Sequence, residues 1–172
     1  RKVFTFLGKP VGITQEMVDL TATTALEHFT ATIASQLLVN PYIQELMTDE
    51  TMKTMWLWHG IEENEHKAVA YDVFEGVFGR GLKAYALRTG SLVTAMATLF
   101  VVQSYFVLRL LQDDKQLNLT SLKDIYIYAY SLSKGVITGM TKEMLVYFRP
   151  RFHPNDLDTH ELLVSWKAKL GF

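Results

Sequence analysis

The sequence predicts an all-α protein: a helical bundle of four long helices followed by a short C-terminal helix. Three observations support this fold class. Only four prolines occur in 172 residues, and none lies between Pro41 and Pro150, which leaves room for long helices. No strand-like alternation of apolar and polar residues stands out. Capping residues and helix-breaking segments divide the chain into helix-length stretches.

The first 13 residues are expected to form an extended lead-in, and residues 14–172 a single bundle domain. The first long helix should run from about Thr14 to Val39. Asn40-Pro41 should end it, because the residue before a proline avoids the helical conformation. A short helical turn is expected at 42–47.

Thr48-Asp49-Glu50 offers an N-cap, so the second long helix should start there. It should continue to about Phe78, where Gly79-Arg80-Gly81 breaks the chain. The third helix is expected over about Leu82–Leu111, and a polar turn at 113–118 follows it.

Thr120 or Ser121 should cap the fourth helix, which is expected to reach about Tyr147. A loop at 149–154 follows. Asn155-Asp156 can cap the last helix, which should end near Leu170.

The third helix is unusually apolar. No charged residue occurs from Thr89 to Leu108, which is about the length of a membrane span. Six polar residues dilute this run, and Arg88 and Arg109 bound it. The interpretation we favour is a buried central helix. The alternative is a helix that lies in or on a membrane, so the protein is expected to be cytoplasmic or membrane-associated through residues 89–108.

Charge and cysteine content exclude several functional classes. The formal net charge is −1, and no block of Lys and Arg is present, so a nucleic-acid partner is not expected. The chain has no cysteine, which excludes disulfides, thiolate zinc sites, iron–sulfur clusters and a cysteine nucleophile.

The most informative motif is the run His59-Gly60-Ile61-Glu62-Glu63-Asn64-Glu65-His66. At about 100° per residue, Glu63 lies roughly 40° from His59, and His66 lies about 20° from His59 on the other side. His59, Glu63 and His66 therefore share one helix face. Imidazole and carboxylate groups together are ligands for iron, zinc or manganese.

Glu27 is the matching candidate on the first helix. It lies within about 40° of four apolar positions on the helical wheel, Leu20, Ala31, Ala34 and Leu38. A carboxylate in an apolar stripe is costly unless it is paired or binds a metal. Metal sites in helical bundles combine a Glu of one helix with Glu-x-x-His of a neighbour, and Glu63-Asn64-Glu65-His66 is such a motif. The sequence thus predicts a metal site that includes Glu27, His59, Glu63 and His66.

The second helix should present this face to the core. The face continues along the helix at Met55, Ala70, Val73 and Val77. Glu62 lies about 60° off the stripe and is a candidate to bridge or support the ligands.

Other polar residues have simpler expected roles. His28, about 100° from Glu27, should be a hydrogen-bonded structural histidine. His153 should cap or pack, and His160 should form a polar surface pair. Lys67 and Asp72 should form salt bridges.

Three segments carry a resemblance to a known family: Leu20–Ala31, Trp56–Val73 and Phe152-His153-Pro154. They resemble a bacterial family labelled predicted metal-dependent hydrolases and span nearly the whole chain. The pattern also looks like ferritin-like di-iron oxygenases of the p-aminobenzoate N-oxygenase type. This resemblance implies a ferritin-like bundle with a binuclear iron centre, or one of manganese or zinc. The implied ligands are those predicted above: Glu27, His59, Glu63 and His66.

The chain departs from those families in one respect. Their members carry two further N-terminal helices with another Glu and another Glu-x-x-His, and nothing before Thr14 supplies these. We expect the chain to be the C-terminal two-thirds of a longer protein. A twofold homodimer would also complete the ligand count. A mononuclear site of His59, Glu63 and His66 is a third alternative.

Three functions fit these residues. The first is a non-haem di-iron oxidase or oxygenase acting on a hydrophobic or aromatic small molecule, which would lie against Met55, Trp56 and the third helix. The second is a hydrolase that uses a metal-activated water, with Glu62 as the catalytic base. The third is a non-enzymatic interaction or membrane-associated protein with a buried His/Glu network.

Overall fold

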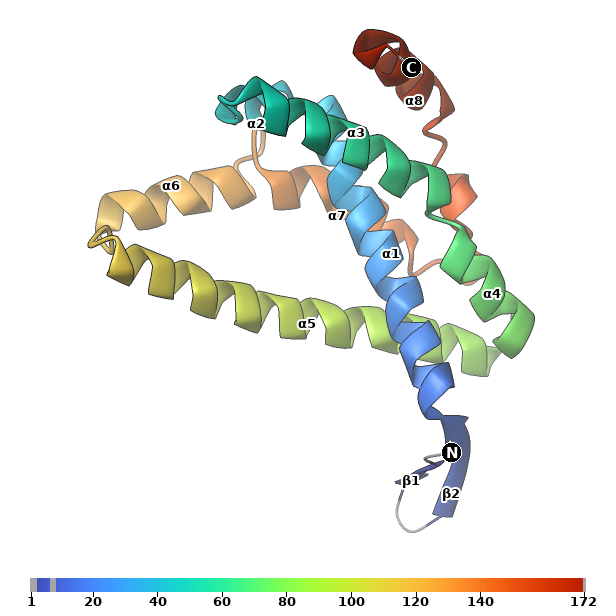
Figure 1. Ribbon diagram of the computed structural model, residues 1–172. Helices are drawn as coiled ribbons and strands as arrows, with labels where there is room; N and C mark the ends of the chain where they lie inside the picture. The colour runs from blue at the N-terminus through green and yellow to red at the C-terminus, as the bar shows by residue number, and fades with distance from the viewer. Residues whose placement is uncertain (1–2, 7–8, 172) are drawn as a thin grey trace.

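The computed structural model is an all-α bundle preceded by one pair of short strands (Figure 1). It describes residues 3–6 and 9–171, with side chains for residue 12 and residues 14–171. The predicted fold class is therefore confirmed. The lead-in is extended as expected, but it also pairs: β1 (Val3–Phe6) lies antiparallel to β2 (Lys9–Thr14), which the sequence did not indicate.

One central helix, α1 (Gln15–Val39), organises the molecule. It crosses the middle of Figure 1 and packs against α3 (Glu50–His66), α4 (Val69–Phe78), α5 (Leu82–Asp113) and α7 (Val136–Val146), in addition to the helix that follows it in the chain. The remaining helices are α2 (Pro41–Leu46), α6 (Leu119–Tyr130), which packs on α7, and α8 (His160–Leu170), which packs on α3.

The predicted helix ends around α2 are confirmed, and local capping explains them. The side chain of Asn40 accepts a hydrogen bond from the backbone N–H of Tyr42, with Pro41 in the first turn of α2. Asp49 caps α3 by accepting from the N–H of Met52 at 2.8 Å. Each cap satisfies an N–H that a helix start leaves without a partner.

The second predicted helix is interrupted. It divides into α3 and α4 at Lys67-Ala68. The Lys67 ammonium donates to the carbonyl of Leu157 and to Oγ1 of Thr159, 3.0 Å away, so a contact distant in sequence holds this break.

The fourth predicted helix divides into α6 and α7 at residues 131–135. A Cβ on Gly135 would lie 2.6 Å from backbone atoms of Ser131, so only glycine fits this tight turn. The last helix is also shorter than expected, since Asn155-Asp156 lie in a 3₁₀ turn (Pro154–Asp156) and α8 begins at His160.

Two apolar clusters pack against α1. The larger joins α1, α4, α5, α7 and the segment after α7, through Ala25, Tyr71, Leu92, Val146, Tyr147 and Phe152. The smaller joins α1 and α3 through Leu38, Leu57 and Ile61, and side chains of α8 cover it. The indole N–H of Trp166 donates to the Leu38 carbonyl at 2.9 Å and fixes α8 there.

The helix α5 is not the buried central helix that we favoured from the sequence. Its buried residues, Ala84, Arg88 and Leu92, all lie in its first third, and almost none of its most apolar stretch is buried. By length and composition, α5 is the one helix among the described residues that could cross a membrane. In Figure 1, α5 and α6 extend away from the body as two arms joined by the turn after Asp113.

The open arms leave a large surface. The chain exposes 11398 Å², whereas a folded monomer of 19.7 kDa is expected to expose roughly 8,600 Å². Since much of the exposed surface on α5 and α6 is apolar, these helices present a face suited to further contacts.

Candidate metal centre

The relative position of α1 and α3 is set by a buried polar contact. The Ser35 hydroxyl on α1 donates to Oδ1 of Asn64 on α3 at 2.9 Å, and both side chains are buried. The Asn64 amide in turn donates to the carbonyls of Gly60 (2.9 Å) and Ala31 (3.5 Å). A buried amide needs such partners, so this contact selects one register between the helices.

In this register, Glu27 of α1 faces Glu63 and His66 of α3. One ligand atom of each residue lies within 4.8 Å of the others. Nδ1 of His66 lies 3.2 Å from Oε2 of Glu27. Carboxylate oxygens and imidazole nitrogens bind divalent metals at about 2.0–2.2 Å, so two ligands of one ion lie up to roughly 4.4 Å apart. Small side-chain adjustments would therefore let the three groups bind one ion.

His59 adjoins this group one turn earlier on α3. Its Nε2 lies 3.3 Å from Oε1 of Glu63, the carboxylate that also belongs to the three-residue group. The structure thus brings three of the four predicted ligands, Glu27, Glu63 and His66, within reach of one ion. The fourth, His59, contacts Glu63 of this group but is not itself part of it.

The group lies at the edge of the core. The Glu63 side chain is 16% exposed, whereas those of His59 and His66 are 47% and 43% exposed. The carboxylates are therefore partly shielded, which strengthens their attraction for a cation. The imidazole side remains open for solvent, a substrate or further ligands.

The core-facing stripe predicted for the second helix is wrong in part. Met55, Val73 and Val77 are exposed, while the buried residues of α3 are Leu57, Gly60, Ile61 and Asn64. The break at Lys67-Ala68 shifts the helical phase, so a wheel drawn through both helices does not describe one face.

A cavity of about 420 Å³ adjoins the candidate ligands. His59 and Glu63 form part of its wall. The rest is largely apolar and comes mainly from α1, α2, α3, α6 and α7: Ile33, Ala34, Leu37, Ile43, Leu46, Met47, Trp56, Tyr128 and Val136. A small apolar molecule in this cavity would lie beside the imidazole of His59 and the carboxylate of Glu63. Met55, expected on the substrate side, is not part of this wall.

Glu62, the predicted catalytic base, lies outside the three-residue group. Its side chain is partly exposed, and its catalytic role stays a prediction.

His28 is buried and stacks on Tyr147, with ring centroids 4.5 Å apart. Burial lowers the pKa of His28 to about 4, so the ring is neutral at physiological pH. His28 is therefore a structural residue, as predicted. However, its Nε2 has no hydrogen-bond partner among the described residues. The ring acts chiefly as an aromatic core residue.

The other polar residues singled out in the sequence differ in how well the structure agrees with their expected roles. His153 caps the 3₁₀ turn, as expected, and its Nε2 lies 2.8 Å from Oδ1 of Asp72. His160 is exposed. Lys67 is buried and bonds to oxygen atoms of the segment before α8, so the predicted salt bridge is wrong.

The sequence reasoning missed the residues that position the ligands. Ser35, Asn64 and Thr24 tie α1 to its neighbours, Thr24 through a hydrogen bond to the Ala70 carbonyl at 3.2 Å. Small polar residues on the apolar side of a helix were the available signal, because burial requires them to find partners.

Fold and geometry define an all-α bundle protein with a carboxylate–histidine group at the crossing of two helices. The chain matches a family described as predicted metal-dependent hydrolase over residues 2–158, and it belongs to this family. Comparison with curated proteins and with solved structures gave no match.

Proposed function

We propose that this protein is a metal-dependent enzyme that oxidises an apolar or aromatic small molecule with O₂ at non-haem iron. Its ligands would be Glu27, His59, Glu63 and His66. The single observation that carries the proposal is the convergence of Glu27, Glu63 and His66 from two helices onto one point. Metal dependence is also what the family description states.

The donor set supports iron or manganese. Two carboxylates and two imidazoles, without thiolates, suit these ions, and zinc also accepts such ligands. Bound iron would supply the redox chemistry that protein side chains lack. Three or four protein ligands leave coordination positions free, and the exposed imidazole side gives access to them.

The residues around the centre would bind and orient the substrate. Apolar side chains of the 420 Å³ cavity would exclude water from an apolar ligand, and Trp56 offers an aromatic surface beside His59. Ring centroids of Trp56 and His59 lie 5.8 Å apart. The substrate would thus be held against the ligand face of α3.

A binuclear centre would need a second set of ligands. Binuclear bundle sites use about four carboxylates and two histidines. The four candidate ligands here are two carboxylates, Glu27 and Glu63, and two histidines, His59 and His66. A second copy related by a twofold axis would supply another Glu27 and another Glu63-x-x-His66. The open side of the group leaves room for this arrangement.

Hydrolysis is the second candidate, and the family description favours it. A bound divalent cation lowers the pKa of water, and a nearby carboxylate can then accept a proton. Glu62 is the residue next to Glu63 that is outside the ligand group and partly exposed, and it would be that carboxylate.

The deciding experiment measures metal content and redox response on the full-length protein. Iron retained by the wild-type protein, with an optical change on exposure to O₂, would support the oxidase proposal. Zinc that supports ester or amide hydrolysis without any redox response would establish the second candidate. The matched control is Glu65→Gln, on the same helix but paired with Lys167 of α8. If Glu63→Gln retains as much metal as Glu65→Gln, the proposed centre is wrong.

We also propose that the exposed face of α5 and α6 rests on a lipid bilayer. The run 89–108 has no charged residue and is hardly buried within the protein, so its apolar side chains can lie in a membrane surface. Exposed aromatic residues occur on both arms: Phe100, Tyr105, Phe106, Tyr126, Tyr128 and Tyr130. Aromatic residues favour the membrane interface, and a bilayer would deliver an apolar substrate to the neighbouring cavity.

A further inference from the structure

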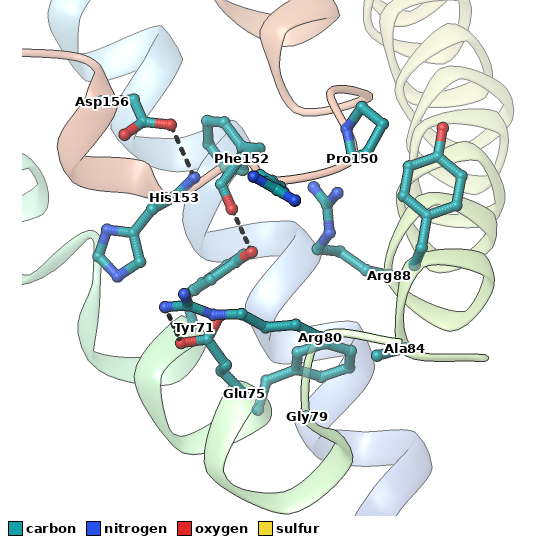
Figure 2. A pocket seen from close by; sticks show the side chains of 13 residues that line it. Tyr71, Glu75, Gly79, Arg80, Ala84, Arg88, Pro150, Phe152, His153 and Asp156 are labelled. Carbon is teal, nitrogen blue, oxygen red and sulfur yellow. Dashed lines mark hydrogen bonds and ion pairs between the residues drawn. The ribbon is translucent and has the colours of Figure 1, made fainter. Parts of the chain in front are cut away.

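A second cavity, of about 650 Å³, lies between α4, the start of α5 and the segment 150–156 (Figure 2). It shares no lining residue with the cavity beside the candidate metal ligands. Its wall combines three arginines, Arg80, Arg88 and Arg151, with aromatic rings. Neither the family description nor the proposed oxidation accounts for it.

The two carboxylates in this wall already have partners. Glu75 accepts two hydrogen bonds from Arg80, one of them 2.7 Å long, and this pairing lowers the pKa of Glu75. Asp156 accepts from the backbone N–H of His153 at 3.0 Å. Figure 2 shows both interactions as dashed lines. Among the described residues, neither carboxylate forms an ion pair with Arg88 or Arg151.

Arg88 is the unusual member of this set. Its side chain is buried, and no described carboxylate lies within ion-pair distance of it. The guanidinium reaches from α5 toward the 150–156 segment and donates to the carbonyls of Tyr147 and Arg149. Two hydrogen bonds use two of its five N–H groups. A buried charge without a counter-ion is costly, so an anion bound nearby would be stabilised.

The aromatic residues define the rest of the ligand. The Arg88 guanidinium carbon lies 4.6 Å from the Tyr147 ring centroid and 5.5 Å from those of Tyr85 and Phe152. Tyr71, Tyr85 and Phe152 contribute to the cavity wall. Cation and rings together match a molecule with an anionic group on a flat apolar body.

We propose that this cavity binds a small organic anion, a carboxylate or phosphate group on an aromatic or apolar body, with Arg88 and Arg151 holding the anionic group. The rings of Tyr71, Tyr85 and Phe152 pack against its body. Arg88 also joins α5 to the segment after α7 through its two hydrogen bonds, so its guanidinium is already held in position before a ligand binds. The site is separate from the proposed metal centre.

The test is isothermal titration of the full-length protein with four probes: phenyl phosphate, benzoate, inorganic phosphate and benzyl alcohol. The first two combine an anionic group with an aromatic ring. Inorganic phosphate has only the anionic group, and benzyl alcohol has only the ring. Phenyl phosphate or benzoate should bind at about millimolar or tighter concentration. Inorganic phosphate and benzyl alcohol should each bind at least roughly 10-fold more weakly.

Two variants separate this cavity from other sites. Arg151→Gln should weaken binding of the preferred anion by roughly 10-fold, because a charge-assisted hydrogen bond is lost. Glu75→Gln should tighten it by several-fold, because Arg80 is then released toward the cavity. Arg109→Gln, on the exposed end of α5, is the matched control and should leave binding unchanged.

Three outcomes would overturn the proposal. The first is that neither organic anion binds. The second is that Arg151→Gln binds these anions as well as Arg109→Gln does. The third is that inorganic phosphate binds as tightly as phenyl phosphate. Phosphate groups also bind metals, so Glu63→Gln is titrated in parallel. Retained binding by Glu63→Gln is expected, and its loss would place the anion at the metal centre instead.

Discussion

Nδ1 of His66 lies 3.2 Å from Oε2 of Glu27, although the two residues are 39 positions apart in the sequence. One residue belongs to α3 and the other to the middle of α1, so their contact depends on how the two helices cross. With no metal bound, the pair is a hydrogen bond between an imidazole and a carboxylate. With a divalent ion between them, both groups would turn their lone pairs to the metal. The same two atoms thus serve folding and the proposed chemistry.

Glu27→Gln should abolish most metal affinity while leaving the fold intact. The amide keeps the shape and a hydrogen bond to His66 but is a far weaker ligand. Removing groups that only orient ligands costs about 10–100-fold in affinity, so loss of a ligand should cost at least roughly 100-fold. Competition titration with a chromophoric chelator measures the affinity, and circular dichroism checks the fold. Glu45→Gln, exposed on α2, should behave like the wild type. Equal metal affinity of both variants would contradict the assignment.

Asn64→Ala should lower the free energy of unfolding by about 2–3 kcal/mol. The substitution removes the hydrogen bonds to Ser35 and Gly60 and leaves buried polar groups without partners. Urea unfolding followed by circular dichroism measures the change. Ser133→Ala, at an exposed position, should stay within about 0.5 kcal/mol of the wild type. An equally small effect of Asn64→Ala would show that the contact does not set the helix register.

His28 should make stability fall in mild acid. Its pKa is about 4 in the folded protein, because of burial, and 6.5 for a solvated histidine, so folding favours the neutral ring. The stabilisation is fully present above pH 6.5 and is lost as the pH falls toward 4. The difference between the two pKa values corresponds to a loss of about 3 kcal/mol in the free energy of unfolding over this pH range. Thermal unfolding in EDTA across pH 4–7 measures it. His28→Phe, which keeps a ring against Tyr147, should flatten the dependence, and an unchanged slope would contradict the assignment.

Two glycine substitutions should have opposite effects. Gly135→Ala should destabilise the protein by about 1–3 kcal/mol, since the new Cβ would meet backbone atoms of Ser131 at 2.6 Å. Gly76→Ala, inside α4 with no atom within 4 Å of the added Cβ, should stabilise by up to about 1 kcal/mol. Thermal melts of the two variants make the comparison. A gain in stability from both would show that the turn before α7 is less tight than described.

The α5–α6 face should bind lipid vesicles. We expect the full-length protein to float with phosphatidylcholine liposomes in a density gradient, and Val101→Asp to reduce the floated fraction, because a charge on the exposed apolar face is costly to bury in lipid. Leu145→Asp, at an exposed position on α7, is the control with the same change in charge. Absence of flotation together with a dimer in analytical ultracentrifugation would instead identify this face as an interface between copies.

Much of the candidate site could be predicted because helix geometry is local. A period of 3.6 residues places His59, Glu63 and His66 on one face in any helix, so the three candidate ligands on α3 followed from their spacing. Which face of α3 meets α1 did not follow, because the exposed Met55 is an apolar residue like the buried Leu57 and Ile61. That choice depends on Ser35 and Asn64, whose partnership is visible only once both helices are packed.

The sequence by itself determined the helical class, the ends of helices near Asn40, Asp49 and Gly79-Arg80-Gly81, and the identity of the candidate ligands. These features depend on capping, backbone conformation and side-chain chemistry, which act over a few residues. The tertiary structure decided the break at Lys67-Ala68, where a buried ammonium bonds to residues about 90 positions later. It also decided that Glu27 meets His66 and that most of α5 lies exposed. Such features depend on contacts between distant segments, and these contacts contribute to stability only once the segments are packed together.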